Sequence, residues 1–295
     1  MIVFATVSSH SGGGSSKVSI AITGKLIRRS TKTLFAGFAA VSFFSSPGAL
    51  SKSQEELAKQ LANPIASLIS VPLQYNYNSD IGPTDDGERS LINIQPVIPI
   101  EMNQDWNAIS RTILPIISQD DVFPGEGSQS GLGDVLQSVF FSPKAPTERG
   151  WIWGAGPVAL IPTASDDLLG AEKWALGPTA VALKQEGGVT FGGLVNHIWS
   201  VAGDDDRNDI SSSFLQPFLS FTTPGATTFT VNLESSYDWK SENWSVPVNV
   251  LVSQVLKLGG QMLSIGGGAR YWIDSTPGGP EGWGVRLQLT LLFPK

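Results

Sequence analysis

The strongest constraint on the fold is a series of apolar runs, each about ten residues long, in which hydrophobic and polar side chains alternate. Residues 71–78, 228–239 and 285–293 show the alternation most clearly. Successive side chains of a β-strand point to opposite faces, so a period of two predicts strands with one apolar and one polar face. A tilted strand of about ten residues crosses a bilayer, whereas a helix needs about twenty. The runs therefore favour membrane-spanning strands.

About twelve such runs follow one another, and an even number is expected of a bacterial outer-membrane barrel. They lie near residues 70–79, 90–101, 105–118, 131–142, 150–163, 174–184, 188–200, 211–223, 226–239, 244–256, 261–273 and 283–293. Short connections alternate with longer ones, as short periplasmic turns alternate with longer extracellular loops in these barrels. The sequence thus predicts an all-β fold, a transmembrane antiparallel up-and-down barrel of about twelve strands with a short N-terminal helix.

The acidic residues separate this fold from a soluble β-sandwich, which also alternates apolar and polar side chains. Most of them lie in the longer connections, and a sandwich has no reason to place its acids on every second loop. We therefore expect these loops to be extracellular. The acidic residues that define them are Asp120, Asp121, Asp166, Asp167, Asp204, Asp205, Asp206 and Asp209.

The composition narrows the possible functions. Charged residues make up 15% of the chain, against about 25% in ordinary soluble domains. A net charge of −7 argues against binding to nucleic acid, whose phosphates would be repelled. The absence of cysteine excludes disulfides, thiolate metal sites and a cysteine nucleophile. We expect no cofactor, no bound metal and no enzymatic activity.

The N-terminal part has a different organisation. Residues 1–50 resemble a signal or targeting segment, with a basic stretch, a short apolar stretch and small residues at 45–49; a membrane anchor is the alternative. Residues 51–69 contain a predicted helix over 53–63, which ends before Pro64. This segment is either a periplasmic lead-in or a plug of the lumen. Residues 70–295 form the predicted barrel.

Prolines inside the predicted strands conflict with this pattern, because proline removes a donor from the strand ladder. A closed barrel has no edge strands, so we expect several of these prolines at β-bulges. They are Pro72, Pro96, Pro99, Pro115, Pro157, Pro162, Pro178, Pro217 and Pro247.

Several segments together resemble a known family. These include LANPIASLISVPLQYNYN, NIQPVIPI, SRTILPII, GLGDVLQSVFFSPK, GWIWGAGPV, LIPTASDDLLG, NHIWSVAGDDDR and GPEGWGVRLQLTLLFPK. The chain resembles, over roughly residues 55–295, bacterial outer-membrane transporters related to the barrels encoded beside phenol meta-cleavage pathways. Some members carry a misleading "neuromedin U" label. The resemblance implies a β-barrel that passes small, aromatic or hydrophobic molecules, and it brings no catalytic residues.

The chain departs from many outer-membrane proteins at its C-terminus, where Phe293 is followed by Pro294 and Lys295. Insertion by the barrel-insertion machinery, which reads a terminal aromatic residue, is the expected route.

Alternation also predicts which polar side chains face the lumen. These are Gln74, Asn76, Asn93, Gln95, Arg111, Asn232, Glu234, Arg270, Arg286 and Gln288. In a barrel of about twelve strands the interior is narrow, and charges of both signs should pair across it. The set is either a constriction that selects solutes by charge and size, or a polar network that fills the interior.

Aromatic residues near the strand ends should form belts at the two lipid–water interfaces. The candidates are Trp106, Trp151, Trp153, Trp199, Tyr237, Trp239, Tyr271 and Phe293. His197, beside Trp199, is more simply a belt residue than a catalyst, because its sequence neighbour Asn196 faces the opposite side of the strand. A catalytic partner such as serine would have to come from an adjacent strand.

The run Asp204–Asp206 with Asp209 could bind calcium, but it lacks the spacing of an EF-hand loop. A solvated acidic loop is the simpler interpretation. A third interpretation is that the loop shares bridging divalent ions with lipopolysaccharide.

Three functional hypotheses remain. The first is a channel that passes small molecules by passive diffusion through a narrow polar lumen, surrounded by outer-membrane lipid and lipopolysaccharide. The second is a closed structural barrel that binds lipopolysaccharide or a partner. The third is a lipid hydrolase on the barrel wall that uses His197.

Overall fold

The computed structural model describes residues 50–294, so the predicted targeting segment lies outside the described residues except for Leu50, the first residue of α1. The helix is α1, Leu50–Leu61. The strands are β1 Ile69–Ile81, β2 Gly87–Ile94, β3 Val97–Glu101, β4 Trp106–Asp120, β5 Gln129–Leu132, β6 Val135–Pro143, β7 Trp151–Ile161, β8 Lys173–Glu186, β9 Val189–Gly203, β10 Ser211–Thr222, β11 Thr227–Leu233, β12 Ser235–Asp238, β13 Asn243–Leu258, β14 Gln261–Asp274 and β15 Gly282–Phe293. Among the described residues, no helix is long and apolar enough to cross a membrane.

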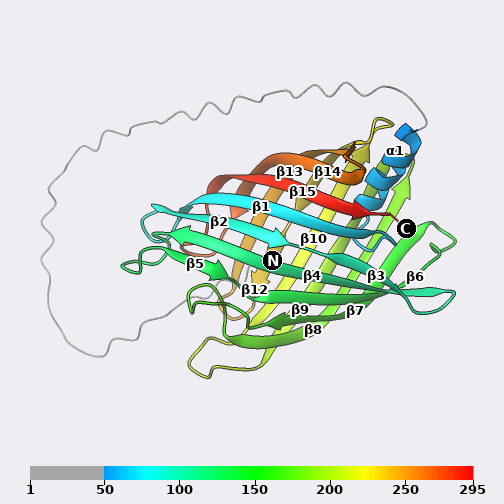
Figure 1. Cartoon of the computed structure of the whole chain (residues 1–295). Helices are drawn as coiled ribbons and strands as arrows, with labels where there is room; N and C mark the ends of the chain where they lie inside the picture. The colour runs from blue at the N-terminus through cyan, green and yellow to red at the C-terminus, as the bar shows by residue number, and fades with distance from the viewer. Residues whose placement is uncertain (1–49, 295) are drawn as a thin grey trace, which may run out of the picture. The chain divides into compact units, whose positions relative to one another are not determined.

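The strands form one closed antiparallel sheet (Figure 1). Closure comes from β1 and β15, which pair from Ile69 opposite Phe293 to Tyr77 opposite Val285. Three strands are interrupted, because β2 and β3, β5 and β6, and β11 and β12 each pair with the same neighbouring strand. The barrel therefore has twelve strands, and the fold predicted from the alternation is confirmed.

The two ends of the barrel differ in their connections. The turn rim carries the connections 102–105, 144–150, 187–188, 223–226 and 259–260, most of which are short. The loop rim carries 82–86, 121–128, 162–172, 204–210, 239–242 and 275–281, most of which are longer. Figure 1 shows α1 at the end of the barrel where β15 ends, which is the turn rim. There the Gln185 amide donates a hydrogen bond of 2.8 Å to the backbone oxygen of Lys59.

The helix ends earlier than the sequence predicts. It was expected over residues 53–63 but spans Leu50–Leu61. Proline disfavours a helical conformation in the residue before it, so Pro64 keeps Asn63 out of the helix. The turn that follows is closed by a hydrogen bond from the Asn63 amide to the Gln60 oxygen, 3.0 Å long.

The outer face of the barrel is an apolar belt. Its exposed side chains include Ile92, Ile116, Val195, Leu215, Leu219, Val231, Val250, Ile265 and Leu287. A soluble protein would not leave a continuous apolar surface of this extent in water. The belt surrounds a closed barrel with no free backbone edge, which is the arrangement that lipid requires of a spanning sheet. This surface makes the chain a transmembrane barrel.

The interior is divided into two unlike halves. On the inner faces of β6–β9, apolar side chains pack into a core that includes Leu136, Val158, Leu183, Leu194 and Ile198. On the opposite wall, β1, β2 and β10–β15 turn mainly polar side chains inward. The expectation of a polar lumen therefore holds for one half of the interior, because the runs that form β7–β9 are apolar on both faces.

The segment after α1 crosses the interior at the turn rim. Leu57, Ala58 and Ala66 pack with residues of β13 and β15 on one wall. Ile65 packs with residues of β4, β6, β8, β9 and β10 on the other wall. The Asn107 amide adds a hydrogen bond of 3.1 Å to the Ser67 hydroxyl. Residues 57–68 thus bridge opposite walls of the barrel.

The in-strand prolines are accommodated mostly without bulges, contrary to expectation. Pro96 lies in the break between β2 and β3, and Pro247 adjoins a register shift in the β13–β14 pair. Pro157 and Pro178 face each other across β7 and β8. On its other side each proline faces a gap in strand pairing. Beside Pro157, the β6–β7 pairing stops at Val158 and resumes at Ala155. Beside Pro178, the β8–β9 pairing stops at Leu176 and resumes at Thr179. At Pro157 and Pro178 the missing donors therefore coincide with gaps in the ladders, whereas Pro72 and Pro217 lie within continuous registers opposite Thr290 and Gly193.

Candidate functional site

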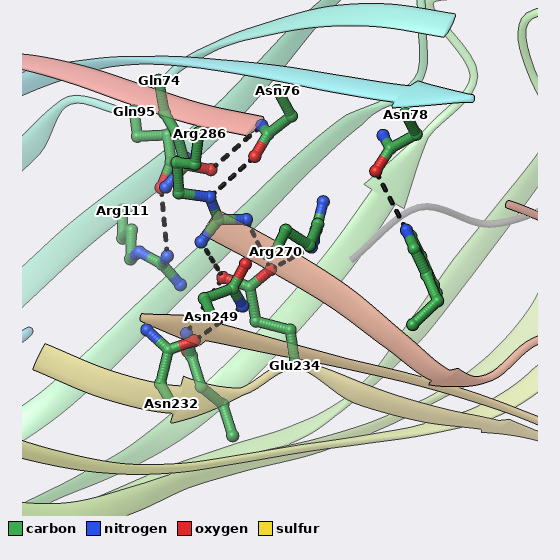
Figure 2. A network of polar contacts seen from close by, with 12 residues as sticks. Gln74, Asn76, Asn78, Gln95, Arg111, Asn232, Glu234, Asn249, Arg270 and Arg286 are labelled. Carbon is green, nitrogen blue, oxygen red and sulfur yellow. Dashed lines mark hydrogen bonds and ion pairs between the residues drawn. The ribbon is translucent and has the colours of Figure 1, made fainter. Parts of the chain in front are cut away.

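The interior encloses a cavity of about 290 Å³. Its lining includes all ten residues that alternation predicts to face the lumen, from Gln74 on β1 to Gln288 on β15. Figure 2 shows most of them directed at one another from opposite strands. Because α1 and residues 61–68 also line the cavity, it extends from the middle of the barrel to the turn rim.

Glu234 is the centre of the polar contacts. Its carboxylate accepts two hydrogen bonds from Arg286, from Nη1 at 2.7 Å and from Nη2 at 2.8 Å. Arg270 forms a second ion pair with the same carboxylate through Nη2. A two-pronged contact between guanidinium and carboxylate fixes both groups in orientation as well as distance. Glu234 thereby ties the ninth strand of the barrel to β14 and β15 (Figure 2).

Local strand structure places this carboxylate. Glu234 lies at the break between β11 and β12, and its amide donates a hydrogen bond of 3.1 Å to the Pro247 oxygen. Pro247 has no N–H to return, so the ladder opens there. Because the register continues across the break, Glu234 keeps the inward direction that it shares with Asn232.

Amide side chains extend the network around the wall. Arg286 donates through Nε to Asn76 at 2.7 Å, and the Asn249 amide donates to Asn232 at 2.9 Å. On the other side Arg111 donates to the Gln95 oxygen at 3.2 Å. Figure 2 shows the Arg111 guanidinium directed at the same group of side chains. The Gln95 and Asn76 amides each donate to the Gln74 oxygen at 3.4 Å, so the network runs from β4 through β1 and β15 to Glu234. The Asn232–Asn249 pair lines the same cavity beside it.

The charges around the cavity do not balance. Its charged lining residues are Arg111, Arg270, Arg286 and Glu234, so three guanidinium groups face one carboxylate. Both Arg270 and Arg286 pair with Glu234. Among the described residues, Arg111 makes its polar contact with the neutral Gln95 and has no carboxylate within ion-pair distance. The site carries two positive charges in excess.

Sequence reasoning missed an apolar part of the same cavity. Ile113, Leu136, Phe214 and Phe218 line it beside the polar network. The inward positions of β10 alternate apolar and polar, with Gln216 between the two phenylalanines. Alternation along β10 could have predicted that the two phenylalanines face the lumen. It could not have predicted which side chains of other strands lie near them.

The predicted aromatic residues gather at the two rims. At the turn rim, Trp106 and Trp153 meet edge to face with ring centroids 5.9 Å apart, and Trp151 packs against Phe191 at 5.8 Å. Phe293 is exposed at the same rim. At the loop rim, ring pairs join Tyr237 to Trp239 at 4.9 Å and Tyr271 to Trp283 at 4.9 Å, and Trp199 and Trp239 both contact His197.

His197 has the adjacent-strand serine that a catalytic reading would require. Its Nδ1 lies 2.7 Å from the Ser213 hydroxyl, whose oxygen also accepts a hydrogen bond from Trp239 Nε1 at 2.9 Å. Its Nε2 is buried without a hydrogen-bond partner among the described residues. A general base is normally oriented by a third group through its second nitrogen. The geometry therefore fits an aromatic interface cluster better than a catalytic pair.

The predicted acidic loop residues all lie at the loop rim. Asp209 accepts a hydrogen bond of 3.1 Å from Ser200, and the amines of Lys240 and Lys173 lie 3.6 and 3.8 Å from its carboxylate. The Ser200 hydrogen bond and these cations hold the pKa of the Asp209 carboxyl below its usual value. Within residues 50–294, no group of three or more His, Cys, Asp or Glu side chains has the geometry of a metal site.

No family model and no curated protein matches the sequence. The fold is similar to a crystal structure of an outer membrane channel from Pseudomonas putida F1, with a TM-score of 0.60 and 16% identity, over 77% of this chain and 96% of that chain. It is also similar to the outer membrane phospholipase A of Escherichia coli, with a TM-score of 0.45 and 8% identity, over 78% of this chain and 99% of that one. A Salmonella typhi outer membrane phospholipase dimer with bound calcium matches at a TM-score of 0.45 and 8% identity, over 85% and 99%.

The closed sheet, the apolar belt, the two aromatic rims and the likeness to the Pseudomonas structure define the class of this protein. It is an outer-membrane β-barrel.

Proposed function

We propose that the chain is an outer-membrane channel through which small molecules diffuse passively. The observation that carries this proposal is the cavity of about 290 Å³ inside a closed barrel, lined on one wall by a charged and amide-rich network. A barrel with a purely structural role needs no such cavity, because its interior could be filled by side chains as it is along β6–β9. The likeness to a channel of the same fold supports the same role.

The polar network has the features of a selective constriction. The Glu234 contacts with Arg270 and Arg286 fix charged groups on the wall of the solute path. Fixed charges in a narrow pore select solutes by charge and size. The apolar side chains of Ile113, Leu136, Phe214 and Phe218 beside them favour solutes with a hydrophobic part.

The segment 57–68 acts in this proposal as a plug. It bridges opposite walls and lines the cavity at the turn rim. In this proposal the turn rim faces the periplasm. Its contacts with the barrel are side-chain packing and a few hydrogen bonds, while the barrel strands are joined by continuous ladders. Displacement of residues 62–68 would open the path without unfolding the barrel.

Liposome swelling tests the channel directly. Purified chain is refolded into liposomes, which are then diluted into iso-osmotic solutions of small neutral sugars and of small organic acids. We expect swelling that is faster for the smaller solutes, because a cavity of this size sieves by volume. The control is the same chain heat-denatured before reconstitution. A folded barrel, verified by heat-modifiable gel migration, that gives no swelling with any solute contradicts the proposal and favours a closed structural or partner-binding barrel.

One contact is shared by a second, less well supported candidate, a lipid hydrolase on the barrel wall. It is the 2.7 Å contact between His197 and Ser213 on the outer face. The test is hydrolysis of phospholipid by the purified chain, with Ser213→Ala as the matched variant. Hydrolysis that this substitution abolishes supports the candidate, and the absence of hydrolysis by the unmodified chain removes it.

A further inference from the structure

We propose that the cavity contains a binding site for an organic carboxylate with an apolar body, in which Arg111 is the main anchor. The site lies in the proposed solute path, so as a description of the transported solute it rests on the proposed channel function. As a binding site it stands on its own contacts.

The first support is the charge of the cavity. Three guanidinium groups and one carboxylate line it, which leaves two positive charges without a counter-charge. Glu234 is shared by Arg270 and Arg286, and Arg111 contacts only the neutral Gln95 among the described polar groups. Arg111 is only half-buried, but it faces a narrow interior in which a nearby anion stabilises a guanidinium group. The missing partner is therefore an anion.

The second support is the set of donors that remain free. The Arg270 Nε is buried with no hydrogen-bond partner among the described residues. Arg111 uses Nη2 for its contact with Gln95 and retains further donors of its planar fork. Guanidinium forks match the two oxygens of a carboxylate. These donors are directed into the group of side chains around Glu234, as Figure 2 shows for Arg111.

The third support selects an organic anion over a small inorganic one. Ile113 follows Arg111 along the inward face of β4, and Leu136 lies opposite Ile113 on β6. Phe214 and Phe218 line the same cavity from β10. A ligand whose carboxylate meets Arg111 would place its hydrocarbon part against these side chains. Both halves of such a ligand are then removed from water favourably.

Calorimetric titration of the refolded full chain in detergent tests the site. The probe is benzoate, and its neutral isostere benzamide and the smaller acetate are the matched ligands. We expect benzoate to bind more tightly than benzamide by roughly tenfold or more. A hydrogen bond between charged groups contributes enough binding free energy to account for a difference of this size. Acetate should also bind more weakly than benzoate, since it lacks the apolar body. Equal affinity for benzoate and benzamide, or inorganic phosphate binding as tightly as benzoate, overturns the proposal.

Substitutions assign the binding to the cavity. Arg111→Gln should weaken benzoate binding by roughly tenfold or more, and Arg111→Lys should restore part of it by keeping the charge without the fork. The control is Arg149→Gln, which removes an arginine from an exposed turn at the turn rim and should leave the affinity unchanged. Heat-modifiable migration verifies that each variant is folded. Benzoate binding that Arg111→Gln leaves intact places the ligand elsewhere and refutes the site.

The two proposals fail separately. If benzoate binds through Arg111 but liposomes do not swell, the site stands and the channel is wrong. If liposomes swell but benzoate does not bind more tightly than benzamide, the channel stands and the carboxylate site is wrong.

Discussion

At the scale of single residues, Glu234 determines the interior of the barrel. It forms ion pairs with two arginines, Arg270 and Arg286, whose strands are far from it in the sequence. Alternation along each strand predicts that all three face the lumen. It does not predict that they meet, because a period of two fixes the face of a strand but not its height against the opposite wall.

Replacement of Glu234 by glutamine should destabilise the folded barrel by roughly 3–5 kcal/mol, because it leaves two buried guanidinium groups without a counter-charge. The measurement is the free energy of unfolding of the refolded chain in guanidinium chloride. Glu242→Gln is the control, since Glu242 is exposed in a loop. Equal stability of the two variants would mean that the arginines are compensated by other groups.

At the scale of strands, glycines beside the in-strand prolines determine how closely neighbouring strands of the wall can approach. The gaps in the ladders beside Pro157 and Pro178 are matched by glycines that let neighbouring backbones approach. A Cβ at Gly177 would overlap the backbone oxygen of His197, whereas one at Gly193 would have its nearest neighbours 3.8 Å away. The sequence shows the Gly-Pro pairs, but only the register shows which neighbouring backbone they approach.

Gly177→Ala should therefore prevent or strongly impair folding, because backbone atoms and not a flexible side chain occupy the space of the new methyl group. Gly193→Ala, one strand away, should fold like the unmodified chain. The fraction of each variant with heat-modifiable gel migration measures this. Efficient folding of Gly177→Ala would mean that β8 and β9 separate there without cost.

The plug belongs to the same scale. The sequence leaves residues 51–69 as either a periplasmic lead-in or a plug, and it cannot decide between them, since residues 62–68 have no periodicity and no partner in the sequence. Ile65 is 4% exposed and packs with Ile109, Phe140, Val181, Leu183, Leu194 and Phe214. Ile65 packs against the apolar half of the interior, which is formed by strands that are apolar on both faces. Alternation cannot predict which side chains of such strands face the interior.

Ile65→Ala should loosen the plug and raise solute passage while the barrel remains folded. Loss of a buried isoleucine side chain costs about 2–5 kcal/mol of packing, and here the loss falls on the plug contacts. The rate of liposome swelling is the measurement, and Glu56→Gln, at an exposed position of α1, is the control. A slower rate with Ile65→Ala would contradict a plug role for residues 57–68.

At the scale of the whole molecule, the apolar belt and the closed sheet make a barrel that fits lipid. Strand number, strand positions and the distinction between turn rim and loop rim could all be predicted from alternation and from the acidic loops. The strand interruptions at residues 95–96, 133–134 and 234 could not be predicted, because each depends on hydrogen bonds with neighbouring strands.

Leu287→Lys places a charge at mid-height on the outer face of β15 and should destabilise the barrel in lipid by about 2–4 kcal/mol. Leu258→Lys, beside the turn at Gly259, should cost about 0–1 kcal/mol, because a lysine near the interface reaches water. Unfolding free energies in lipid vesicles compare the two variants. Equal costs would mean that Leu287 does not face the hydrocarbon core.

Passage of solutes through the interior of this barrel can be observed directly by single-channel recording in planar bilayers. We expect stepwise conductance from the unmodified chain, with longer or more frequent openings for Ile65→Ala and a higher permeability for anions than for cations under a salt gradient. A folded barrel that stays silent both with and without the Ile65→Ala substitution would mean that solutes do not pass through its interior.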